Sequence, residues 1–134
     1  MSIPGPSADQ PVEGYTAMKY LCLIYDEEQR WTTMTQAEME AMMGEYIAFT
    51  KDISQSGHYL GGNDLQPTRS ATTVRVRNGR LSTTDGPFAE TKEQLGGYYL
   101  IEAKDLNEAI QIASRIPSAK LGAIEVRPIQ EHDI

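Results

Sequence analysis

The chain has 134 residues, the length of one domain, and 40% of them are hydrophobic, enough for one modest core. Its formal net charge of −7 argues against binding to nucleic acid or to an anionic membrane, which requires a basic surface. It has no apolar run near the ~20 residues of a membrane span and no N-terminal signal pattern, so we expect a cytoplasmic protein.

The two ends of the chain are expected to lie outside the domain. Residues 1–17 contain three prolines and two glycines and few apolar side chains, which is typical of a flexible tail. We therefore predict a tail over 1–17, one domain over 18–130 and a short tail over 131–134. Met18 begins the first strand-like run, so it is either the true start of the domain or an alternative initiation site, and the sequence leaves both open.

The first predicted element is a buried strand over residues 19–25, a short apolar run rich in β-forming side chains. It contains Cys22, the single cysteine, so no internal disulfide can form. We expect Cys22 to be a packed strand residue rather than a nucleophile, because the sequence shows no base close to it. A polar loop is expected over residues 26–33.

The second predicted element is a long helix. Thr35 and Glu38 have the spacing of a capping box, in which each side chain accepts a hydrogen bond from the other residue's backbone N–H. Apolar side chains recur at helical spacing as far as Ile53, and Gly57 is suited to end the helix.

The middle of the chain predicts a hairpin followed by a charged loop. Strands are expected over 72–77 and 80–84, and in the first of them valines alternate with arginines. Asn78-Gly79 joins the two strands and favours a tight turn in which both residues have positive φ. The loop over 85–97 carries four charged side chains between two strand-like segments.

The last part of the chain predicts a strand over 98–102, a helix capped by Asp105 and ended by Pro117, and a closing strand over 123–127. The element order indicates an α+β fold of ferredoxin-like type, a split β-α-β sandwich extended by the hairpin. Two helices then cover one face of the sheet, and the other face must be covered by a partner or line a pocket. A homodimer that packs sheet against sheet is the economical solution.

The loop over 85–97 and the strand after it resemble the signature of the DGPF family, within the YCII-related superfamily. Three other segments also resemble that family: the opening strand over 19–25, the stretch over 56–62 that follows the first helix, and the closing strand over 124–128. The resemblance therefore covers about residues 18–130.

This resemblance implies a dimeric α+β barrel made of ferredoxin-like protomers. It also implies a link to regulation, since some relatives are encoded beside, or fused to, extracytoplasmic-function sigma factors. Some members of the wider superfamily are lyase-like enzymes that use a His–Asp pair. The histidines of this chain, His58 and His132, do not stand in a context that matches the enzymatic histidine.

The first candidate for chemistry is Asp85, which ends a strand just before a Gly-Pro joint. It acts either as a general acid or base, or only as the acceptor of an Asx-turn. Glu90, Lys92 and Glu93 are candidate ligand-binding residues, with Lys92 orienting a substrate carboxylate; the alternative is a solvated set of ion pairs. His58 is a weaker catalytic candidate, which needs Asp85 or Glu90 within hydrogen-bond reach.

Arginines concentrate around the predicted hairpin, among them Arg75 and Arg77. They predict an anion-binding pocket or a patch for an acidic protein partner. The alternative is cross-strand pairing with carboxylates such as Glu102 and Glu125. The single aromatic of the loop, Phe88, is expected to anchor the loop in the core.

These residues favour a small homodimeric protein that binds a small polar or anionic molecule in a pocket near the Asp85 loop. Two alternatives stay open: an acid–base enzyme of lyase or isomerase type, and a non-catalytic regulatory module linked to extracytoplasmic-function sigma factors. We expect no cofactor and no metal site, because no spacing of histidine, cysteine and aspartate resembles a ligand set.

Overall fold

The computed structural model of the chain describes residues 17–132. Residues 1–16 of the tail predicted over 1–17, and residues 133–134 of the tail predicted over 131–134, lie outside the described residues. The strands are β1 (Met18–Asp26), β2 (Tyr59–Asp64), β3 (Thr72–Arg77), β4 (Arg80–Asp85), β5 (Gln94–Ala103) and β6 (Ala123–Pro128). The α-helices are α1 (Glu28–Thr33), α2 (Gln36–Gln55) and α3 (Leu106–Ala113), and short 3₁₀ turns cover Thr68–Ser70 and Pro117–Lys120.

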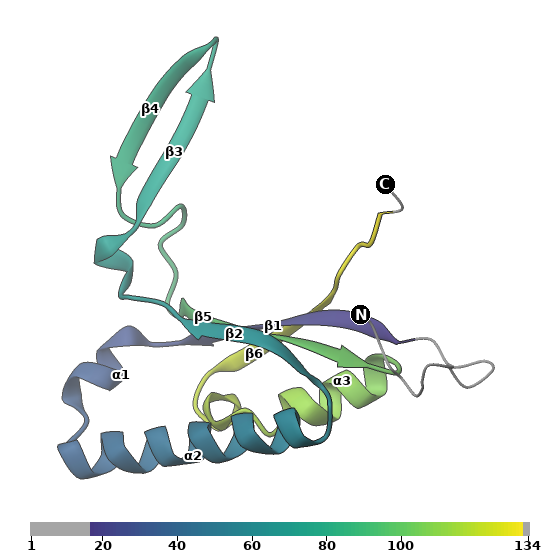
Figure 1. Cartoon of the computed structure of the whole chain (residues 1–134). Coiled ribbons are helices and arrows are strands. Elements are labelled where there is room, and N and C mark those ends of the chain that lie inside the picture. The colour runs from purple at the N-terminus through teal and green to yellow at the C-terminus, as the bar shows by residue number, and fades with distance from the viewer. Residues whose placement is uncertain (1–16, 133–134) are drawn as a thin grey trace.

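Four strands form one antiparallel sheet in the order β2-β5-β1-β6. Helices α2 and α3 lie on one side of this sheet, and no helix covers its other side among the described residues (Figure 1). The chain is therefore an α+β protein, and its strand order is compatible with the predicted ferredoxin-like arrangement. Within residues 17–132, no helix combines the length and the apolar character needed to cross a membrane.

The core lies between the sheet and the two helices. Strand β1 alternates strictly, so that Tyr20, Cys22 and Ile24 are buried against the helices while the residues between them face the other side. Helix α2 contributes Phe49 and Ile53 to the same core. Each large apolar side chain buried in this way contributes about 1.5–3 kcal/mol to the free energy of unfolding.

Both long helices begin at the predicted caps. Thr35 Oγ1 accepts from the backbone N of Glu38, and Glu38 Oε1 accepts from the backbone N of Thr35, at 3.1 and 2.9 Å. At the start of α3, Asp105 Oδ1 accepts from the backbone N of Glu108, while Glu108 Oε1 accepts from the backbone N of Lys104. Gly57 ends α2 with a positive φ of 84°, which only glycine adopts without strain. The expected loop over 26–33 is wrong in part, since it contains α1.

Strand β2 was not expected as a strand, because its Gly61-Gly62 pair weakens the β pattern. It pairs with β5, and glycine allows the two backbones to approach closely. A Cβ on Gly62 would lie 2.8 Å from the carbonyl O of Tyr98, and one on Gly97 would lie 2.9 Å from the carbonyl O of Asn63. The register between β1 and β5 also shifts at Gly96, which therefore forms a bulge. Gly62 and Gly97 allow the close approach of β2 and β5.

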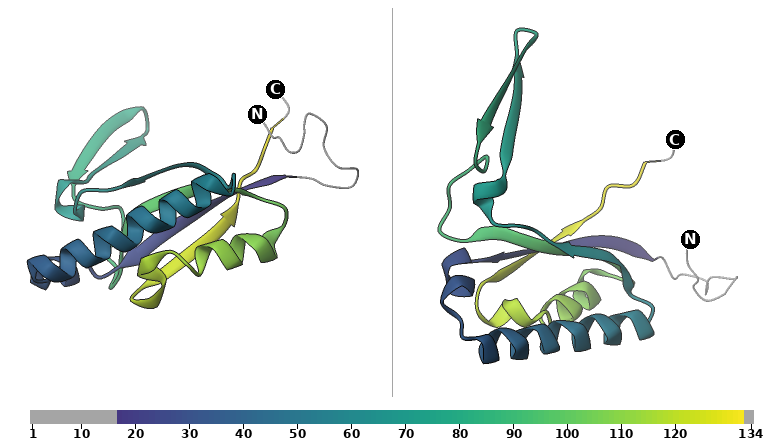
Figure 2. Two further views of the ribbon diagram at one scale, coloured as in Figure 1. Left: turned by 60° about the horizontal axis from the view of Figure 1, so that its bottom comes forward. Right: turned by 60° about the vertical axis from the view of Figure 1, so that its left-hand side comes forward.

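The hairpin forms as predicted but lies outside the sheet. Strands β3 and β4 pair only with each other, and the turn residues Asn78 and Gly79 have φ of 52° and 73°. The hairpin, residues 72–85, projects away from the sheet on the side opposite the helices (Figures 1 and 2). We call it the arm. The expected pairing of its arginines with Glu102 and Glu125 is wrong, since Glu102 lies opposite Lys19 on β1 and Glu125 contacts Arg127 at 3.9 Å.

The burial of Cys22 gives a direct test of the core. Its side chain is 0% exposed, and burial raises the pKa of the thiol to about 11. We expect the native protein at about pH 8 to react with a thiol reagent far more slowly than the unfolded protein does. Between about pH 9 and 11 the unfolded chain loses this proton first, so the native state binds more protons and the free energy of unfolding falls as the pH rises. Rapid, complete labelling of the native protein would contradict this core.

Candidate functional site

Backbone geometry and hydrogen bonds determine the conformation of the Asp85 loop at its start. Gly86 has a positive φ of 109°, and its backbone N donates to the carbonyl O of Ala71 at 2.7 Å. Its carbonyl O accepts from Thr73 Oγ1 at 2.9 Å. These bonds close the base of the arm at the Gly-Pro joint, which positions Asp85 as the last residue of β4.

The charged side chains of the loop are exposed and form no ion pair with one another in the part of the chain that the structure describes. Asp85, Glu90 and Lys92 are exposed, and Glu93 is half-buried. The loop is held instead by uncharged contacts: Thr91 Oγ1 donates to the carbonyl O of Glu93, and a glutamine side chain donates to the carbonyl O of Thr91. The charged groups are therefore free to meet solvent, a ligand or a partner.

Phe88 is not the core anchor that the sequence predicts. Its side chain is 80% exposed, and the Arg75 guanidinium lies over the ring at 5.7 Å from the centroid. This cation–π contact joins Arg75 to the Asp85 loop. Arg77 does not reach the loop, since it lies at the tip of the arm directly opposite Arg80.

His58 directly precedes β2, whereas the arm follows the other end of that strand. Its Nδ1 contacts Ser56 Oγ at 2.7 Å, and its Nε2 lies 3.4 Å from Glu108 Oε2. His58 thus connects the end of α2 to the start of α3. The structure does not bring it together with Asp85 or Glu90, which a proton shuttle at the loop would need.

A second polar group, which sequence reasoning missed, lies at the end of β1. Asp26 is only 6% exposed, and its Oδ1 accepts from the Arg30 Nε at 3.1 Å and from the backbone N of Glu27 at 2.7 Å. Its Oδ2 is buried and has no hydrogen-bond partner within residues 17–132. A signal was present: Asp26 continues the buried alternation of Cys22 and Ile24, so a carboxylate occupies a core position.

A hydrogen bond between buried hydroxyls lies in the same end of the core. Tyr46 Oη and Ser118 Oγ are 2.6 Å apart. Burial is the main cause that raises the pKa of the Tyr46 phenol, and the nearby charges of Tyr99 and Asp26 raise it further. Tyr46 is therefore a neutral hydrogen-bonding group at physiological pH.

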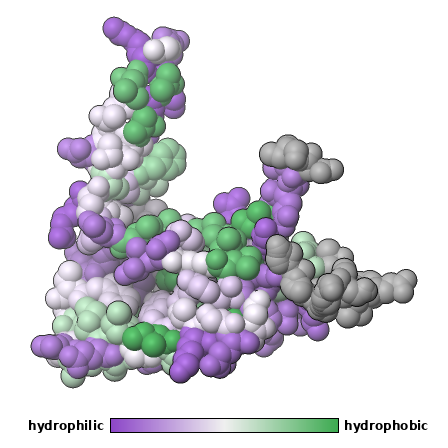
Figure 3. Space-filling view, viewed as in Figure 1, coloured by the Kyte–Doolittle hydropathy of each residue, from purple (hydrophilic) through white to green (hydrophobic). Residues whose placement is uncertain are grey.

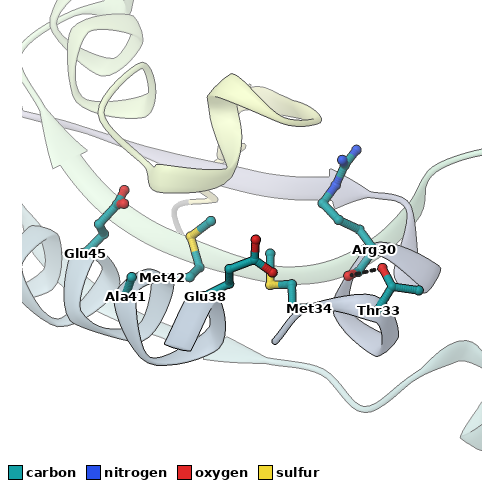
Figure 4. A pocket seen from close by; sticks show the side chains of 7 residues that line it. All are labelled: Arg30, Thr33, Met34, Glu38, Ala41, Met42 and Glu45. Atoms are coloured by element: carbon teal, nitrogen blue, oxygen red, sulfur yellow. Dashed lines mark hydrogen bonds between the residues drawn. The ribbon is translucent and has the colours of Figure 1, made fainter. Parts of the chain in front are cut away.

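A cavity of 340 Å³ opens beside α2, near Asp26. It is lined by Arg30, Thr33, Met34, Glu38, Ala41, Met42 and Glu45. In Figure 4 the two glutamates and Met42 point from α2 toward the same side, while Arg30 rises from α1. Its volume is sufficient for a small metabolite.

Charges in this cavity are partly compensated. Arg30 pairs with Asp26, and Lys120 Nζ pairs with Glu45 at 2.9 Å. Glu38 is engaged through one oxygen by the cap of α2. The cavity therefore combines the Arg30 guanidinium, carboxylate oxygens of Glu38 and Glu45 that are not engaged, and the apolar side chains of two methionines. Such a lining is suited to a small polar molecule. Residues 17–132 contain no cluster of three or more histidine, cysteine or acidic side chains that could hold a metal ion.

Residues 17–132 form a small α+β protein with one sheet face that no helix covers, a projecting arm and a cavity beside α2. The chain belongs to the YCII-related family, since the model of the YCII-related domain matches residues 18–133. An uncharacterized protein of Rhizobium meliloti (strain 1021) is 37% identical over 114 residues, which cover 84% of this chain and 92% of the relative. The predicted YCII-related membership is thus confirmed.

The Asp26–Arg30 pair should stabilise the fold more than the surface pairs do. Arg30→Gln would leave a buried carboxylate without its charged partner, and we expect the free energy of unfolding to fall by about 1–3 kcal/mol. Lys120→Gln is the matched control, because it removes an exposed pair and should cost less than about 0.5 kcal/mol. Urea denaturation measures both, and equal effects would contradict a structural role for the buried pair.

Proposed function

We propose that the protein is a homodimer that binds a small polar or anionic molecule. The observation that carries this proposal is the sheet face opposite α2 and α3, which we call the open face. It presents half-buried apolar and aromatic side chains on the two central strands: Leu21, Leu23, Tyr25, Tyr98 and Leu100. Figure 3 shows hydrophobic atoms along this surface and on the arm.

A second copy of the chain is the occupant best suited to the open face. Leu21 lies opposite Leu100 and Leu23 opposite Tyr98, so the apolar side chains form a continuous patch across β1 and β5. Such a patch is stable only when another layer covers it. An isologous contact supplies a matching apolar layer from the partner. At the rim of the patch, Asn63 donates to the Tyr98 hydroxyl at 3.0 Å.

The ligand site that we propose lies at the Asp85 loop. Arg75, held over Phe88, provides a guanidinium for a carboxylate or phosphate group. Lys92 adds a second cation, while Asp85 and Glu90 provide hydrogen-bond acceptors on the same loop. A dimer partner over the open face would shield these exposed groups from solvent and strengthen their contacts with a ligand.

The cavity beside α2 is a second candidate location for the same function. It is supported by its volume and by Arg30, whose guanidinium is oriented by Asp26. The Oδ2 of Asp26, which has no hydrogen-bond partner among the described residues, supports the alternative of an acid–base enzyme as a candidate group for proton transfer.

Within the YCII-related family, we propose that the chain belongs to the DGPF branch. The run Asp85-Gly86-Pro87-Phe88 supports this, because the structure gives its glycine a geometric role at the base of the arm and leaves its phenylalanine exposed.

The dimer is tested by placing a charge on the open face. Leu23→Arg would bury an unpaired guanidinium between two sheets, so we expect this variant to be monomeric. Ile47→Arg changes an exposed apolar residue of α2 and should leave the dimer intact. Sedimentation equilibrium measures the mass of each, and a wild-type protein that stays monomeric at all concentrations would contradict the dimer.

The ligand site is tested by thermal unfolding with a panel of metabolites that carry carboxylate or phosphate groups. A compound at a hundredfold excess over its Kd should add about 2.7 kcal/mol to the free energy of unfolding and raise the Tm. For such a compound, Asp85→Asn should abolish the shift and Arg30→Gln should retain it. The reverse result would move the site to the cavity, and a wild-type Tm that no compound raises would contradict the binding function.

A further inference from the structure

The arm has two faces of different chemistry. Val74, Val76 and Leu81 lie on one face and are 59%, 58% and 70% exposed. The other face carries three arginines: Arg75, Arg77 and Arg80. Within residues 17–132, β3 and β4 pair only with each other, and only Arg75 of the three arginines is half-buried, beside Phe88.

An arm of this kind is poorly stabilised by its own contacts. A two-stranded hairpin alone is marginally stable in water, and like charges directly opposite each other destabilise it. Arg77 and Arg80 occupy such a directly opposed pair at the tip, and neither forms an ion pair within the described part of the chain. Both side chains are exposed, so they are available to carboxylates from outside the described residues.

The base of the arm is nevertheless held in a defined direction. Glu28 of α1 accepts from both the backbone N and the Oγ1 of Thr68, each at 2.6 Å, just before β3. The bond from Gly86 to Ala71 closes the other side of the base at 2.7 Å. A preoriented arm loses little conformational entropy when it docks.

The length of the arm exceeds the distance between two packed sheets. Its strands have six residues each and therefore extend about 20 Å, whereas face-to-face sheets pack about 10 Å apart. A second copy seated on the open face would place its own sheet about halfway up the arm. The arm tip would then lie alongside the body of that copy.

The charges of arm and body are complementary. The arm holds three arginines and one aspartate, so its net charge is +2, and the rest of the chain has 9 basic and 18 acidic residues, a net charge of −9. A second copy of this chain thus presents the acidic body that the arm arginines lack in their own protomer.

We infer that the arm of each copy grips the acidic body of its partner through the arginines at its tip. This inference rests on the homodimer proposed above and adds a second contact to the sheet interface.

The test reverses two arm charges in the full chain. The double variant Arg77→Glu with Arg80→Glu should raise the dimer Kd at least about tenfold at low ionic strength. Added salt should reduce this difference in Kd between the variant and wild type. Lys51→Glu with Lys104→Glu is the matched control: it makes the same change in net charge at exposed sites on the body and should alter the Kd by less than about threefold. Sedimentation equilibrium gives the Kd, and far-UV circular dichroism verifies the fold.

Each outcome has a distinct meaning. If both double variants dimerise as tightly as wild type, or weaken the dimer equally, the arm grip is overturned while the sheet dimer stands. If wild type is monomeric, both the dimer and the grip are overturned.

A second measurement follows the contact directly. A photo-reactive benzophenone side chain at position 82, which lies opposite Arg75 on the arginine face, should give covalent dimers whose cross-linked peptides come from the partner body outside residues 72–85. The same group at position 51 on α2 should give far fewer. Cross-links from position 82 that reach only its own chain would overturn the grip.

Discussion

The rest of the structure depends on the central sheet, of which helices cover only one face within residues 17–132. Strict alternation in β1 directs Tyr20, Cys22 and Ile24 toward the helices and places leucines on the other side. Helices α2 and α3 cover the first face, and the sequence supplies apolar side chains for both. A domain of this size cannot leave a central sheet face in water without losing much of the stabilisation that its burial would provide. The proposed dimer, the sheltering of the Asp85 loop and the grip of the arm all follow from this one constraint.

Most elements of the fold could be predicted from local patterns. The capping residues Thr35 and Asp105, the end of α2 at Gly57 and the Asn78-Gly79 turn are each determined by backbone hydrogen bonds within a few residues. The position of the hairpin could not be predicted in this way. Strand β2 occupies the free edge of β5 and so excludes the hairpin from the sheet, and the β2 sequence is too rich in glycine to reveal itself as a strand.

Residues of the candidate sites could be predicted only where the local backbone conformation requires a particular residue type. Gly86 has the backbone conformation that its loop requires, but Phe88 is exposed, because an aromatic residue in a loop does not reveal which layer it meets. His58 contacts Glu108, fifty residues further along the chain, and a contact between such distant residues leaves no pattern in the local sequence. Asp26 was different: its place in the alternation of β1 assigns a carboxylate to the core, and the polar surroundings at that end of the sheet explain how the core accommodates it.

The arginines of the arm also affect how readily one exposed hairpin pairs with another. An exposed hairpin with free strand edges and two valines on one face can template edge-to-edge pairing with other chains. In β3 an arginine follows each valine, so an identical strand that paired in register would bring like charges together. The arginines that we propose for the partner contact therefore also oppose edge-to-edge pairing of one arm with another.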